Sequence, residues 1–286
     1  MSGMLGLKID VDTHQGMRDG VPRLLDILKK NDVQATFYLS IGPDASGRAI
    51  LQLLKNPRFL KKMVKTRAAS LYGFRTALYG TLLPSPLIAL SFPEIVRRIK
   101  AEGHEVQFHA WDHRRWQDEL PTKSEAWIRD WFARGIAGFE SILGEKPTSF
   151  GAPAWLIDDR VLSIAGGLGF SYLSCTRAAS PFIHEGINLL EIPSDIPCFE
   201  EVGMEDGAQK ILAALTEGGR HVLPVHAEVE GGIMADAFIS LLASIKKMDC
   251  RFVRLGDMIP LIDASRLPVR RFRLELLPGR SVPCAV

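Results

Sequence analysis

Short apolar runs alternate with amphipathic segments of helical period along most of this chain. Residues 4–11 read as a buried strand, residues 20–31 carry apolar positions on one helical face, and residues 33–40 read as another strand. Two strands joined by such a helix pair in parallel, because the crossover helix covers the sheet. The alternation continues along the chain, so we predict an α/β fold, a deformed (β/α) barrel with seven or eight parallel strands.

The composition supports one full core. The chain has 286 residues, of which 47% are hydrophobic and 24% are charged, and this composition excludes a disordered chain. The sequence holds no run of about 18 apolar residues, so we expect no membrane span. No charged and then apolar leader precedes the first strand, and no CxxC pair occurs among the four cysteines, as is typical of reduced cytosolic thiols. We expect a single barrel unit over residues 1–265.

Periodicity and turn residues predict the later elements of this barrel. We expect helices at 92–102, 122–143, 158–166, 204–217, 232–247 and 255–262, and strands at 104–108, 148–151, 170–174, 189–193, 221–225 and 251–254.

The stretch 43–91 interrupts the alternation and is too long for an ordinary connection. Between Ala45 and Pro93 it carries eight Lys or Arg and no Asp or Glu. Apolar residues lie among these cations, which predicts an insertion of amphipathic helices after the second strand. Such helices suit an anionic membrane surface, although a basic subdomain on the barrel rim or a dimer contact would show the same pattern. The residues expected to contact the membrane are Phe59, Lys61, Lys62, Lys65, Arg67, Leu71, Tyr72, Phe74, Arg75, Leu78, Tyr79, Leu82 and Leu83.

Residues 266–286 form a basic tail with five Arg, three Pro and one Glu. We expect this tail to be loosely docked on the barrel.

Two histidines stand four residues apart in the stretch His109-Ala-Trp-Asp-His113. On a helical turn this spacing places both rings on one face, close enough to share a metal ion. The stretch follows an expected strand, and α/β enzymes keep their chemistry at the C-terminal ends of strands. Two structural or surface histidines would show the same spacing.

Two carboxylates and a third histidine also lie at strand ends. Asp10 and Asp12 would point to the same side of an extended strand, where they repel each other unless they share a cation or a proton. A metal bound to one carboxylate leaves the other free to act as a base, although Asp12 could instead cap the following helix. His226 ends the strand 221–225, where a histidine suits a general acid.

These motifs, in this order, resemble the polysaccharide deacetylase family, also called the NodB-homology family or carbohydrate esterase family 4. The resemblance rests on Asp10-Val-Asp12, His109-Ala-Trp-Asp-His113, Gly151-Ala-Pro153 and Pro224-Val-His226. Further stretches, among them Gly20-Val-Pro-Arg-Leu-Leu25, are similar to one branch of the family, which removes a formyl group from a lipid-linked amino sugar.

The resemblance implies a hydrolase that acts on a linear amide bond. Asp12, His109 and His113 would hold one divalent metal ion, with zinc favoured and manganese, cobalt or nickel as alternatives. Asp10 would act as the base and His226 as the acid, and Asp195 is a candidate for supporting His226. The weaker candidates for substrate binding are Trp111, Gly151, Ala152, Pro153, Glu228 and Glu230.

The implied substrate is undecaprenyl-phosphate-linked 4-deoxy-4-formamido-L-arabinose, and the implied process is lipid A aminoarabinose modification, which gives polymyxin resistance. The enzyme would then lie peripherally on the cytoplasmic face of the inner membrane, against anionic lipids. The alternatives are an N-deacetylase of another N-acylated sugar or polysaccharide and an inactive carbohydrate-binding relative. We expect no nucleic-acid partner, because no binding motif is present. The oligomeric state stays open.

One departure from the family concerns the base. Many members carry an Arg-x-Pro motif after the fourth strand, whose arginine steadies the base. Here the arginine position is Gly151, so the sequence leaves open which residue steadies Asp10.

Overall fold

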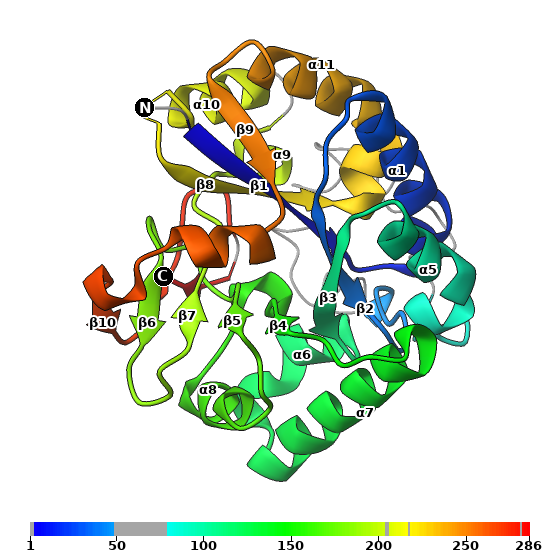
Figure 1. Cartoon of the computed structure of the whole chain (residues 1–286). Coiled ribbons are helices and arrows are strands. Elements are labelled where there is room, and N and C mark those ends of the chain that lie inside the picture. The colour runs from blue at the N-terminus through cyan, green and yellow to red at the C-terminus, as the bar shows by residue number, and fades with distance from the viewer. Residues whose placement is uncertain (1–2, 49–78, 204–205, 217, 281) are drawn as a thin grey trace.

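The computed structural model describes residues 3–48, 79–203, 206–216, 218–280 and 282–286. Its main feature is a 10-stranded sheet that curls around an interior, with helices packed mainly on the outer side (Figure 1). The strands are β1 (Gly3–Val11), β2 (Thr36–Ser40), β3 (Glu105–Ala110), β4 (Ser149–Phe150), β5 (Tyr172–Leu173), β6 (Phe182–His184), β7 (Leu190–Glu191), β8 (Arg220–His226), β9 (Cys250–Val253) and β10 (Val269–Arg270). Their order is β10-β6-β7-β5-β4-β3-β2-β1-β8, and β9 pairs with β1.

The helices predicted from periodicity are present, with boundaries shifted by a few residues. Two short helices, α6 and α9, were not predicted. The helices are α1 (Val21–Lys30), α5 (Pro93–Ala101), α6 (His113–Glu119), α7 (Glu125–Leu143), α8 (Asp159–Gly166), α9 (Phe199–Val202), α10 (Gly207–Ala214) and α11 (Ala235–Ile245), and a 3-10 helix covers Gly256–Leu261.

Strand β1 lies at the centre of the sheet. Strand β8 pairs with it along one edge, while β9 and β2 share the other edge, β9 beside residues 3–6 and β2 beside residues 8–11. All three pairings are parallel, so the carboxyl ends of β1, β2 and β8 meet at one rim. Leu5, Leu7 and Ile9 of β1 are fully buried, which fixes the strand in the core.

The prediction of an α/β barrel fold is confirmed, but the strand count was wrong. The sheet has ten strands instead of seven or eight, because β6 and β10 were not predicted. Strand β6 runs antiparallel to β7. Within the described residues β8 and β10 are the two ends of the strand order, so the sheet curls without closing. Strands of two or three residues are too short to show a periodicity.

The tail is docked, which corrects the expectation of a loose segment. Strands β11 (Leu274–Glu275) and β12 (Cys284–Ala285) form an antiparallel pair. The last three residues are buried, and Cys284 and Val286 pack in one cluster with Trp155. The backbone N–H of Arg177 donates to the carbonyl of Ala285 at 2.8 Å. The basic composition is misleading here, because Arg280 pairs with the buried carboxylate of Glu201 at 3.2 Å.

The insertion is described only at its two ends. Pro43 and Leu87 form an antiparallel bridge, and Ile88 is fully buried. Of the predicted membrane-contacting residues, those from Phe59 to Leu78 lie outside the described residues, as do the expected amphipathic helices. Leu82 is 81% exposed and Leu83 is 37% exposed. Among the described residues, no helix combines the length and the apolar character needed to cross a membrane.

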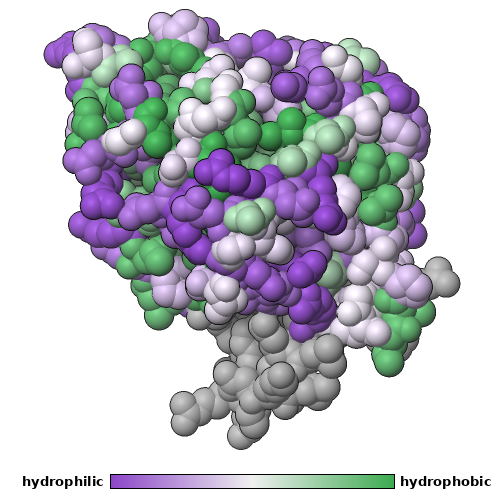
Figure 2. Space-filling view, turned by 90° about the horizontal axis from the view of Figure 1, so that it is seen from below, coloured by the Kyte–Doolittle hydropathy of each residue, from purple (hydrophilic) through white to green (hydrophobic). Residues whose placement is uncertain are grey.

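The surface seen from below is mixed. Figure 2 shows apolar side chains in several separate patches among polar ones, and no single apolar face covers this side.

Candidate metal centre and active site

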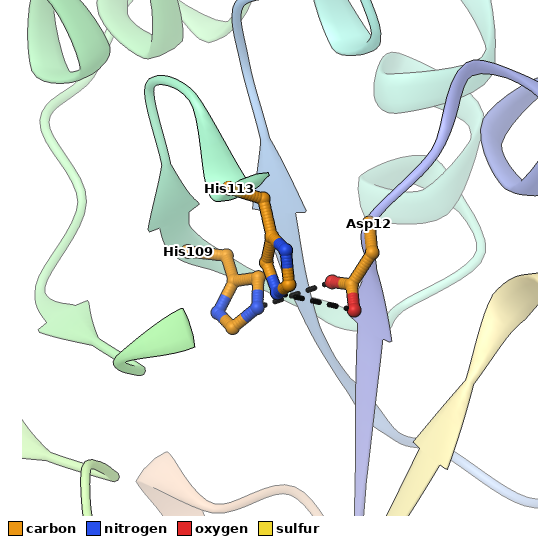
Figure 3. A group of neighbouring side chains, drawn as sticks. All are labelled: Asp12, His109 and His113. Atoms are coloured by element: carbon orange, nitrogen blue, oxygen red, sulfur yellow. Dashed lines mark ion pairs between the residues drawn. The ribbon is translucent and has the colours of Figure 1, made fainter. Parts of the chain in front are cut away.

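One carboxylate and two imidazoles converge at the rim formed by the carboxyl ends of the strands. Asp12 follows β1, His109 lies near the end of β3, and His113 is the first residue of α6. The Nε2 atoms of His109 and His113 lie 3.1 and 3.2 Å from the two carboxylate oxygens of Asp12 (Figure 3). The three residues predicted as metal ligands are therefore neighbours in space.

Neighbouring groups fix the direction of both rings. The carbonyl of Gly151 accepts from Nδ1 of His109 at 2.6 Å, which leaves Nε2, facing Asp12, as the lone-pair atom of the neutral ring. Asp112 caps α6 by accepting from the N–H of Arg115, and the turn from β3 into α6 brings His113 beside His109. The two ring centroids lie 5.1 Å apart.

This arrangement fits a metal ion. His109 Nε2 and Asp12 Oδ1 are both buried and make no hydrogen bond within the described chain. Burial lowers the pKa of His113 to about 4, which keeps that ring neutral at pH 7. Burial raises the pKa of Asp12, but the two histidines outweigh burial and hold this pKa well below its usual value. Two nitrogen ligands and one oxygen ligand are typical of a catalytic zinc site with an open position.

The proposed base and acid face the same rim from adjacent strands. Asp10 of β1 and His226 of β8 are paired residues in the strand register. Asp10 is 3% exposed, and both of its oxygens contact the ammonium group of Lys8. Sequence reasoning missed Lys8 as a site residue, although the alternation in Lys8-Ile-Asp10 was a usable signal.

His226 is surrounded by carboxylates. Its Nδ1 lies 3.0 Å from Oε2 of Glu200, and its backbone N–H donates to Glu230 at 2.7 Å. Burial lowers the pKa of His226, but the negative charges of Glu200, Asp12 and Glu230 raise it to about 10. The ring is therefore protonated at neutral pH, as a general acid must be.

Asp195 does not support His226, so that expectation was wrong. Its carboxylate instead lies 2.6 Å from Nδ1 of His221 and accepts from the N–H of Val222. Glu200 lies beside His226 in the position expected for Asp195. No sequence pattern pointed to Glu200, because it lies in the short helix α9, which was not predicted.

Comparisons with known proteins agree with this geometry. A family model described as polysaccharide deacetylase matches residues 7–173. The chain belongs to the polysaccharide deacetylase family. It is 35% identical over 265 residues to a Shewanella sediminis protein named as the 4-deoxy-4-formamido-L-arabinose-phosphoundecaprenol deformylase ArnD, covering 91% of this chain and 86% of the relative. A protein of the same name from Wigglesworthia glossinidia brevipalpis is 30% identical over 276 residues, covering 93% and 96%.

A solved structure supports the fold of this polysaccharide deacetylase. A Mycobacterium smegmatis protein named as a polysaccharide deacetylase superposes with a TM-score of 0.67 at 22% identity, covering 96% of each chain. At this identity the likeness concerns the fold alone. As members of the family are hydrolases of amide bonds, the chain is a hydrolase of that class.

The loop Gly151-Ala-Pro153 lies at the centre of this polysaccharide deacetylase site. Gly151 contacts His109 through its carbonyl, and the following Ala154 and Trp155 have positive φ angles of 53° and 54°. This strained turn directs the Trp155 ring toward His226, at 6.4 Å between centroids. The loop thus connects the metal group with the acid.

The remaining candidates fall into two groups. Glu228 and Glu230 are 7% and 1% exposed, so neither is a solvated turn residue. Burial raises the pKa of Glu228 well above its usual value and that of Glu230 to about 7. Trp111 packs beside Gly42, where an added Cβ would lie 2.7 Å from its ring. The described contacts of Trp111 are this packing and a hydrogen bond that its carbonyl accepts from the N–H of Gly42 at 2.9 Å.

Proposed function

We propose that this chain is a metal-dependent deformylase that removes the formyl group from undecaprenyl-phosphate-linked 4-deoxy-4-formamido-L-arabinose. The single observation that carries the chemistry is the convergence of the Asp12, His109 and His113 group with Asp10 and His226 at one rim. The choice of substrate comes from the two relatives named as ArnD, each of which this chain matches over most of its length. The process would be aminoarabinose modification of lipid A.

The chain's own residues divide the hydrolysis between them. Asp12, His109 and His113 would hold the divalent ion, zinc most readily, and this ion would supply Lewis-acid polarisation of the formamide carbonyl. Asp10 takes a proton from the attacking water as the oxygen bonds to the formyl carbon. His226, held protonated by its carboxylate neighbours, gives its proton to the nitrogen as the C–N bond breaks. Formate and the amino sugar leave.

Two buried carboxyl groups near His226 suit the product. Glu228 Oε2 and Glu230 Oε1 are buried and make no hydrogen bond within the described chain. Buried polar atoms of this kind require a partner, which a sugar hydroxyl or the released ammonium group would provide. We assign Glu228 and Glu230 to contacts with the sugar, and the loop Gly151-Ala-Pro153 to the wall beside the formyl group.

The proposed membrane contact rests on the basic insertion. The stretch between Ala45 and Pro93 has eight cations and no acidic residue, and each cation near an anionic surface contributes about 1 kcal/mol. The exposed Leu82 and Leu83 lie within this stretch. We place the protein peripherally on the cytoplasmic face of the inner membrane, where its lipid-linked substrate lies.

Vesicle sedimentation tests this contact. Binding to vesicles with anionic lipids is expected to fall as salt is raised, because the attraction is screened. Deletion of residues 72–83 is expected to weaken binding, and vesicles of neutral lipid serve as the control. Unchanged binding after the deletion, or binding that salt does not affect, would contradict the proposal.

The enzymatic proposal is tested with matched substrates. The metal-loaded protein is incubated with the formamido-arabinose lipid and with an N-acetylated analogue, and released formate and acetate are quantified. Formate release is expected to dominate. Preferential acetate release would identify an N-deacetylase, and tight sugar binding without either product would identify an inactive binding relative.

A further inference from the structure

We propose that Lys8 is the positioning residue for the base, and that it occupies the space vacated by the glycine at position 151. The inference rests on the proposed function, because it takes Asp10 as the group that accepts the proton from water. It assigns to Lys8 the role of the family's arginine, which is absent at position 151.

The contact between Lys8 and Asp10 is bidentate and buried. The Lys8 ammonium lies 2.6 Å from Oδ1 and 2.5 Å from Oδ2, and the two side chains are 0% and 4% exposed. Both residues point to the same side of β1, because they are two positions apart on one strand. A carboxylate with both oxygens held by one cation has a restricted orientation.

Aromatic rings complete the surroundings of the cation. The ammonium lies 4.8 Å from the centroid of the Tyr38 ring and 5.4 Å from that of Trp155. Both distances fall within the range of cation–π attraction. The Trp155 ring also lies edge-on to His226, so one side chain is shared by the surroundings of the acid and of the base.

The side chain of Lys8 lies in space that is open because residue 151 is a glycine. An added Cβ at Gly151 would lie 2.7 Å from the Tyr38 ring and 3.2 Å from Cε of Lys8. The lysine stem and the tyrosine ring therefore fill the volume that a side chain at position 151 would need. An arginine at 151 and a lysine at 8 could not both occupy this volume, so we infer that Lys8 takes the place of the arginine that position 151 lacks.

A buried ion pair is weak evidence for stability alone, because desolvation of the two charges costs several kcal/mol. The pair lies beside the metal group, where the orientation of Asp10 decides whether a proton can be taken from water. A purely structural pair and a positioning pair differ in one measurable respect. Both kinds of pair couple the two residues in stability, but only the positioning pair makes the effect of losing Lys8 on kcat depend on Asp10 in variants that fold and bind metal normally.

A double-mutant cycle provides the test, with Lys8→Met, Asp10→Asn and the combined variant. Lys8→Met is expected to lower kcat about 10- to 100-fold, the range typical of groups that orient a metal-site residue, with little change in KM. In the Asp10→Asn background the same substitution is expected to cause no further loss. Lys8→Arg and Lys8→Gln retain a donor and are expected to keep more activity than Lys8→Met. Lys30→Met, on the exposed surface of α1, is the control.

Metal content and thermal unfolding are measured for every variant, so that loss of folding is separated from loss of positioning. The combined variant leaves no unpaired buried charge and is expected to fold. Equal losses from Lys8→Met in both backgrounds, or an unchanged kcat, would overturn the role of Lys8. A wild-type rate in Asp10→Asn alone would instead overturn the assignment of the base in the proposed function.

Discussion

At the residue scale, burial and neighbouring charges set opposite charge states for His113 and His226. His113 is neutral because burial lowers its pKa to about 4, while His226 is charged because the surrounding carboxylates raise its pKa to about 10. Metal ligands must be unprotonated and a general acid must be protonated. The same side-chain type therefore serves two roles within one rim.

Asp10→Asn removes the proposed proton acceptor and leaves the ligands intact. We expect kcat to fall by about 10²- to 10⁴-fold, the usual contribution of a general base, with one bound metal ion retained. Steady-state kinetics and elemental analysis check both parts. Loss of the metal in this variant would show that Asp10 is a ligand instead.

His109→Ala removes a metal ligand whose orientation is fixed by Gly151. We expect the variant to lose most of its bound metal and its activity, because two ligands hold zinc far less well than three. Elemental analysis of the purified protein gives the content, and Asp10→Asn is the matched control that keeps it. Zinc content equal to wild type would refute the ligand set.

The residues that sequence could identify are those whose type and spacing carry chemistry on their own. The pair of histidines and the two aspartates at strand ends fall in this class. Lys8 and Glu200 do not, because their importance comes from the partner that folding brings to them. Asp195 shows the converse error. It was expected to support His226, but the fold places its carboxylate beside His221.

At the element scale, the periodic segments were predictable and the short ones were not. Amphipathic helices such as α1 and α7 carry their period within ten or more residues. Strands β6 and β10 have three and two residues, and they are defined by the strands with which they pair. The docking of the tail was unpredictable for a similar reason, because Arg271 and Arg280 pair with carboxylates that are distant in the sequence.

The tail is expected to stabilise the site wall. Removal of residues 282–286 would uncover Trp155, against which Cys284 and Val286 pack. We expect the free energy of unfolding to fall by about 2–4 kcal/mol, because apolar surface is no longer buried, and denaturant unfolding measures this change. A reduced kcat with unchanged metal content is also expected, because Trp155 lies beside His226 and Lys8. Unchanged stability and rate would show that the wall holds without the tail.

The start of β3 introduces a pH dependence of stability. His104 is 5% exposed and accepts from the N–H of Ala35, and burial lowers its pKa to about 4 from 6.5. The unfolded chain protonates His104 more readily than the folded chain does. The stabilisation by the neutral His104 ring is therefore complete above pH 6.5 and is lost as pH falls toward 4. Replacement by Gln should flatten the stability curve between those two values. An unchanged curve would exclude His104 as the source.

At the scale of the whole molecule, the curled sheet explains how distant segments share one site. Parallel pairing of β8, β1, β2 and β3 brings their carboxyl ends to one rim, as Figure 1 shows. The base, the acid and the metal group come from three of these strands and the turns that follow them. The sequence predicted this convergence, since it depends on strand order and direction more than on exact boundaries.

The most direct test of the central claim is release of formate from the lipid-linked formamido sugar by protein with and without bound metal. We predict one formate per amine formed by protein carrying one divalent ion, and no release after chelation until the metal is restored. Equal formate release by metal-free protein, or no release by fully loaded protein, would contradict the account.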